Sequence, residues 1–154
     1  MTVVAVADTH TVIWYVFADA RLSEKAKEAI DGAAEKGLYI GVSAISLAEI
    51  VYLIEKQRIA PDTLERLLSV CNDPGKVLAE IPLDSAIVQK MSDIPRTDIP
   101  DLPDRIIAAT ALSMEVAVIT RDGKIQMADI ETRTRLSGDF GVLRVALLDL
   151  AQYV

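Results

Sequence analysis

Four acidic residues in this sequence stand beside or within apolar segments, and acids in such positions suggest shared chemistry. Asp8 and Asp122 each follow a short apolar run, Glu49 lies within SAISLAEIVYL, and Asp104 precedes RIIAATAL. An unpaired charge in an apolar setting is costly, so acids that meet in the fold need a cation between them. Ligand sets made only of oxygens favour Mg²⁺ or Mn²⁺. The pattern therefore suggests a divalent-metal site.

Each acid also has a simpler explanation when it is taken alone. Asp8 and Asp104 suit the N-cap of the helix that is expected after each of them. Asp122, in RDGK, suits a turn. Glu49 could lie at a surface edge, although glutamate is almost never buried without a partner. The shared cation is favoured because one site then explains all four residues.

The expected helices and strands bring these acids to one edge of a sheet. Short apolar runs alternate with helical patterns, which predicts an α/β fold with a central, mostly parallel sheet covered on both faces. Sites in such sheets form beyond the carboxyl ends of the strands. The segment 92–104 contains three prolines and is expected to have no regular structure. Strands are expected at 3–7, 38–42, 77–81 and 117–120, and helices at 9–17, 23–37, 43–57, 61–70, 83–91 and 105–114.

Composition indicates a globular domain in a reducing compartment. The chain has 154 residues, of which 51% are hydrophobic and 25% are charged, and it has a single cysteine, Cys71. No charge-free run reaches the roughly 18 residues that span a bilayer, and no signal peptide is recognised, so we expect a cytoplasmic protein without a membrane anchor. The net charge of −7 argues mildly against non-specific nucleic-acid binding. It does not exclude a nuclease, since a bound metal offsets the charge of its acidic ligands.

The sequence resembles PIN-domain ribonucleases of the VapC toxin type. The resemblance rests on ADTHTVIWYV, SAISLAEIVYL, DLPDRIIAATAL and AVITRDGKI, in that order, and it covers residues 4–136. It implies a three-layer α/β/α fold in which Asp8, Glu49, Asp104 and Asp122 match the four acidic positions that hold Mg²⁺ or Mn²⁺. It also implies cleavage of single-stranded or looped RNA, a homodimer, and inhibition by an antitoxin protein. It does not indicate which RNA is cut.

Neighbours of these acids are candidates for supporting roles. Thr9 and Ser46 could orient the acids or a bound water, and helix capping is the alternative. Asp101 belongs to the loop before Asp104. His10, the only histidine, is given no role, because an activated water does not require a general base.

Three further residues are candidates for contact with the substrate. Thr120 and Arg121 are expected near the phosphate. Arg105 could pair with a site acid or contact the RNA backbone, and a surface salt bridge is the simpler alternative. Other cations of the second half, Lys124, Arg133, Arg135 and Arg144, are mixed with acids, which leaves the RNA path open.

The chain is expected to divide into a nuclease domain, residues 1–136, and a C-terminal extension, residues 137–154. Phe140, Leu143, Leu147 and Leu150 have helical spacing. We therefore expect the extension to be a helix that contacts a second copy or a partner.

Two other functions remain open at this point. One is a non-catalytic PIN-like module that binds RNA or protein, although the presence of all four acids argues for catalysis. The other is a different Mg²⁺-dependent phosphohydrolase, because DTHT is similar to the start of phosphatases with an aspartyl nucleophile. Those enzymes need a second aspartate where this chain has His10.

Overall fold

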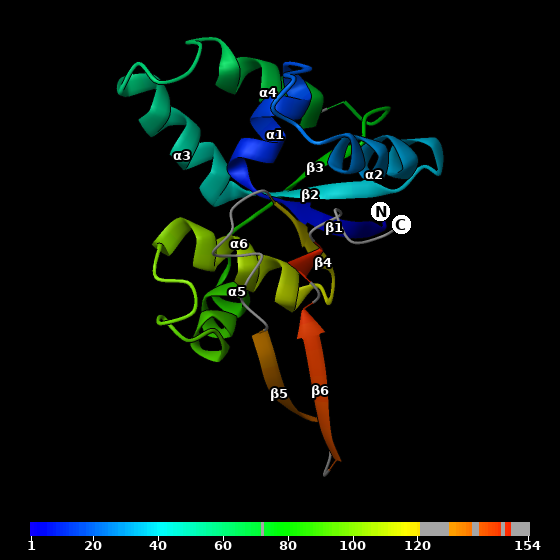
Figure 1. Ribbon diagram of the computed structural model, residues 1–154, viewed down its shortest axis with the longest axis vertical. Helices are drawn as coiled ribbons and strands as arrows, with labels where there is room; N and C mark the ends of the chain where they lie inside the picture. Colours follow the sequence, from blue (N-terminus) through cyan, green and yellow to red (C-terminus); the bar gives the residue numbers. More distant parts are fainter. Residues whose placement is uncertain (72, 121–129, 137–138, 146, 149–154) are drawn as a thin grey trace.

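A parallel β-sheet with helices on both faces organises the chain (Figure 1). The computed structural model describes residues 1–71 and 73–120 in full, and the backbone of residues 130–136, 139–145 and 147–148. Within these residues the sheet has the strand order β3-β2-β1-β4-β7, and each neighbouring pair is parallel. Its strands are β1 (Val3–Ala7), β2 (Tyr39–Ser43), β3 (Leu78–Ile81), β4 (Ala117–Ile119) and β7 (Leu147–Leu148).

Helices cover both faces of this sheet. α1 to α4 lie on one side of it and α5 and α6 on the other, as Figure 1 shows. The three-layer α/β/α fold expected from the sequence is therefore confirmed. No helix among residues 1–71 and 73–120 combines the length and apolarity needed to cross a bilayer. The helices are α1 (Thr9–Val16), α2 (Glu24–Glu35), α3 (Ala44–Glu55), α4 (Thr63–Cys71), α5 (Ser85–Lys90) and α6 (Leu102–Ser113).

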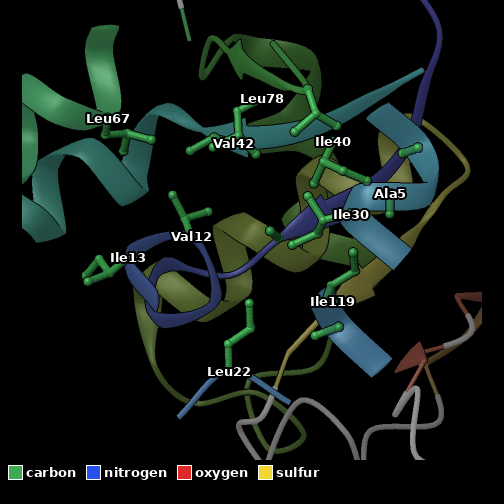
Figure 2. Packing of buried hydrophobic residues seen from close by; sticks show 14 of the residues in the cluster. Ala5, Val12, Ile13, Leu22, Ile30, Ile40, Val42, Leu67, Leu78 and Ile119 are labelled. Atoms are coloured by element: carbon green, nitrogen blue, oxygen red, sulfur yellow. The ribbon is translucent and has the colours of Figure 1, made fainter. Parts of the chain in front are cut away.

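Alternation along β1 divides the core into two layers. Ala5 and Ala7 belong to the cluster that α1, α2 and α4 cover, shown in Figure 2, whereas Val6 packs with Ile107 and Ala111 of α6. Successive side chains of a strand point to opposite faces, so a central strand buries all of them. This explains why the first strand is an uninterrupted apolar run.

The segment 92–104 is more regular than expected. A 3₁₀-helix, η1, covers Met91–Asp93, and α6 begins at Leu102 rather than at residue 105. Pro103 is tolerated in the first turn because the N–H groups there have no partner within the helix. Asp101, not Asp104, is the N-cap of α6.

The prediction of a helix in the C-terminal extension is wrong for the described residues, which form strands. β5 (Ile130–Leu136) pairs antiparallel with β6 (Asp139–Val145), and β7 joins the central sheet beside β4. β-branched residues in β5 and β6, such as Thr132, Thr134 and Val142, favour strands over helix. Leu150 lies outside the described residues. The division of the chain at residue 136 stays a prediction.

Candidate functional site

The strand order reverses between β1 and β4. From β1 the chain builds β2 and then β3 on one side, and it returns to place β4 on the other side of β1. In open α/β sheets, ligand sites form outside the carboxyl ends of the strands at such a reversal. Asp8 directly follows β1 and Thr120 directly follows β4, so both residues lie at this position.

Asp8 has a buried carboxylate, and each of its two oxygens accepts a hydrogen bond. The residue is only 5% exposed. One oxygen accepts a hydrogen bond from the backbone N–H of Thr11 at 2.9 Å, which caps α1. The other oxygen accepts a hydrogen bond from the hydroxyl of Thr120. The capping role and a place in the site are therefore compatible, since they use different oxygens.

Glu49 reaches the same region from α3 and is held through α1. The Thr9 hydroxyl donates to Oε1 of Glu49 at 2.5 Å, and the hydroxyls of Thr9 and Ser46 lie 2.9 Å apart. Because Thr9 has one proton to donate, Ser46 supplies the proton of the second bond. Ser46 and Thr9 are both buried, whereas Glu49 is half-buried. The two hydroxyls thus fix the direction of the Glu49 carboxylate.

Burial and neighbouring carboxylates both disfavour the ionised form of Glu49. Burial raises the pKa of the Glu49 carboxyl above its ordinary value of 4.5, and the charges of Asp101 and Asp8 raise the pKa further. The hydrogen bond from Thr9 and the charge of His10 act in the opposite direction without cancelling the rise. A cation bound here would be stabilised by the same charges that disfavour the ionised carboxyl.

Asp101, which was expected in the loop, is the N-cap of α6, and Asp104, which was expected to be the N-cap, lies inside the helix. The Asp101 carboxylate caps α6 by accepting from the backbone N–H of Asp104 at 3.3 Å, and Asp104 lies half-buried in the first turn. Asp101 acts electrostatically on Glu49, a contribution that its position in the loop did not suggest. The preference for proline in the first turn could have indicated this earlier helix start.

Among residues 1–71 and 73–120, Arg105 forms no salt bridge of the kind considered from the sequence. Its Nη2 donates to the carbonyl oxygens of Met91 at 2.9 Å and Ile94 at 3.0 Å. Its Nε is buried and has no hydrogen-bond partner among the described residues. The side chain therefore links α6 to the segment that includes η1.

The expected four-acid metal site is only partly within the described residues. Asp122 and Arg121 lie outside them. Among residues 1–71 and 73–120, no three acidic, histidine or cysteine side chains form a group that could hold a metal. The donors gathered around Asp8 and Glu49 are carboxylate and hydroxyl oxygens, which match a hard cation such as Mg²⁺. The four-acid site thus stays a prediction with chemically suitable donors.

Comparison with known proteins identifies the family. A sequence model of the PIN domain matches residues 5–131, so this chain belongs to the PIN domain family. It is similar to a protein named Ribonuclease VapC22 from Mycobacterium tuberculosis, with 28% identity over 119 residues, 77% of this chain and 87% of that protein. The fold also resembles a chain in the crystal structure of VapBC2 from Rickettsia felis bound to a DNA fragment from their promoter. That likeness has a TM-score of 0.59 and 17% identity, and it covers 79% of this chain and 90% of the other.

Proposed function

We propose that this protein is a divalent-metal-dependent endoribonuclease and the toxin of a toxin–antitoxin pair. Membership of the PIN domain family and similarity to Ribonuclease VapC22 support this function. The observation that carries it is the buried Asp8 at the strand-order reversal, which is hydrogen-bonded to Thr120. Glu49 lies nearby, and its pKa is raised by burial and, to a smaller extent, by the charges of Asp101 and Asp8.

In this proposal the carboxylates bind the cation, and the hydroxyl groups orient the carboxylates. Asp8, Glu49, Asp104 and Asp122 would hold Mg²⁺ or Mn²⁺. A divalent cation bound there supplies a polarised water and offsets the negative charge of the RNA phosphate. Thr120 orients Asp8, and Thr9, supported by Ser46, orients Glu49, so that the carboxylates are positioned before the substrate binds.

Substrate contacts and partners complete the proposal. Arg121 lies next to Thr120 in sequence, which would bring its charge near the phosphate. An antitoxin partner is supported by the fold shared with a chain of the VapBC2 complex. We further propose a homodimer that acts in the cytoplasm, where the lone Cys71 would stay reduced.

Cleavage of a mixed, end-labelled RNA pool tests the function directly. The purified protein should cut RNA with Mg²⁺ or Mn²⁺ and should not cut it with EDTA. Asp8→Asn should abolish cleavage and leave the fold intact, because an amide oxygen can still cap α1. Asp84→Asn is the matched control, since Asp84 caps α5 in the same way, accepting from the N–H of Ile87 at 3.0 Å. Cleavage at the wild-type rate by the Asp8 variant, or in EDTA, would contradict the proposal.

A further inference from the structure

One row of side chains on α3 runs from the core to the surface through the candidate site. Ile45, Glu49, Tyr52 and Lys56 are separated by four, three and four positions, so they lie on one face of the helix. Ile45 is partly buried and packs against the core cluster that includes Ile107 of α6. Glu49 is half-buried, and Tyr52 and Lys56 are exposed. Figure 1 shows α3 leading outward from the end of β2, which is why the row emerges into solvent.

Tyr52 and Lys56 form the exposed end of this row. The tyrosine is 57% exposed, so its ring is accessible to solvent. The ammonium group of Lys56 lies 5.3 Å from the centre of the ring. In the part of the chain that the structure describes, Lys56 forms no salt bridge, so its charge is not neutralised by a carboxylate. An accessible aromatic ring beside such a cation matches the side chains that bind single-stranded nucleic acid.

The spacing along α3 relates these two groups to the candidate catalytic acid. With a rise of about 1.5 Å per residue, Tyr52 lies about 4.5 Å and Lys56 about 10 Å beyond Glu49 along the helix axis. The ring and the ammonium therefore follow the acid at about one and two helical turns. A strand whose phosphate lies at Glu49 would pass the ring first and the cation next.

We infer that Tyr52 and Lys56 bind the RNA strand beside the phosphate that is cut. A base stacks on the ring of Tyr52, and Lys56 contacts a neighbouring phosphate. Stacking on a side chain requires an unpaired base, which agrees with the single-stranded or looped RNA that the family resemblance implies. This inference rests on the proposed ribonuclease function. Lys56 and Tyr52 would attract RNA locally, although the net charge of the chain is −7.

RNA binding in a variant that does not cleave tests the inference. The probe is a short, mixed-sequence, fluorescein-labelled single-stranded RNA, and its anisotropy is measured with Asp8→Asn protein. Adding Tyr52→Ala should weaken binding about 5- to 150-fold, whereas Tyr52→Phe should retain it. Lys56→Gln should reduce the slope of log affinity against log salt by about 0.7. Lys76→Gln is the matched control, because Lys76 is exposed and precedes β3 at the opposite edge of the sheet.

Three results would overturn the inference, and none of them is the same as failure of the nuclease assay. The first is that the RNA does not bind, or binds equally well to the Tyr52 and Lys56 variants. The second is that a duplex of the same sequence binds as tightly, which excludes stacking. The third is that Tyr52→Ala alters the molecular mass in light scattering but not RNA affinity, which would make this face a protein contact. If cleavage is absent but RNA binding depends on Tyr52, the ribonuclease proposal fails and the binding path stands.

Discussion

The hydroxyl of Thr120 donates a hydrogen bond to the carboxylate of Asp8, although the two residues are 112 positions apart in the chain. This bond joins the end of β4 to the end of β1 at the point where the strand order reverses. The second Asp8 oxygen is already used by the N-terminus of α1. These two hydrogen bonds fix the orientation of the Asp8 carboxylate. Metal ligands are commonly oriented in this way by their hydrogen-bond partners.

Thr120→Val should lower both stability and activity, because it leaves one oxygen of a buried carboxylate without its donor. We expect a loss of about 1–3 kcal/mol in the free energy of unfolding, measured by urea denaturation. Cleavage should fall as well, since Asp8 loses part of its orientation. Thr11→Val is the matched control: its hydroxyl is buried and has no hydrogen-bond partner among the described residues. Equal losses in the two variants would contradict a specific role for the Thr120 bond.

The raised pKa of Glu49 predicts how stability depends on pH when no metal is present. The folded protein holds a proton on Glu49 at pH values above 4.5, where the unfolded chain has begun to release it. Stability in EDTA should therefore fall as the pH rises from 4.5 through the raised pKa. Glu49→Gln should remove this loss, so the variant should melt at a higher temperature than the wild type at neutral pH. The difference should vanish below pH 4.5.

A control on the same helix separates this effect from a general change in charge. Glu55→Gln removes an exposed carboxylate of α3 and should leave the pH profile of the melting temperature unchanged. If Glu49→Gln melts at or below the wild-type temperature in EDTA at neutral pH, the carboxylate is not destabilising and the electrostatic account of the site is wrong.

Local signals predicted most of the fold. Valine-rich runs and capping residues such as Ser23 depend on neighbours a few positions away, and the helices and strands they predict lie close to those observed. The start of α6 was misplaced because Asp101 and Asp104 both suit an N-cap. β6 and β7 were missed because Phe140, Leu143 and Leu147 fit a helical spacing, whereas strand pairing is set by distant partners.

Less of the candidate site than of the fold could be predicted from the sequence. The acids Asp8 and Glu49 could be named from their apolar surroundings. Thr9 could be named only as a neighbour of the acids, and Thr120 only as a residue near the phosphate. The bonds from Thr9 to Glu49 and from Thr120 to Asp8 depend on strand order and helix packing. The role of Arg105 was not foreseen, since its acceptors are backbone carbonyls that carry no sequence signal.

Mg²⁺ should stabilise the folded protein if the acids share a cation. Binding to the folded state alone raises the free energy of unfolding by about 2.7 kcal/mol at one hundred times the dissociation constant. We expect a rise in melting temperature with MgCl₂ that EDTA reverses and that Asp8→Asn reduces. Asp84→Asn, which removes a charge at a different helix cap, should keep the full rise. An equal rise in the Asp8 variant would show that Mg²⁺ binds elsewhere.

Arg105→Lys should destabilise the protein without a specific effect on RNA. The single nitrogen Nη2 donates to the carbonyls of Met91 and Ile94, and lysine keeps the charge but has a shorter reach and no planar guanidinium. We expect a loss of about 1–2 kcal/mol in the free energy of unfolding, with faster amide exchange in the segment that Arg105 holds. Affinity for single-stranded RNA, measured where the variant is fully folded, should be unchanged. Weaker RNA binding at unchanged stability would instead assign Arg105 to the RNA backbone, the alternative that its sequence position also allowed.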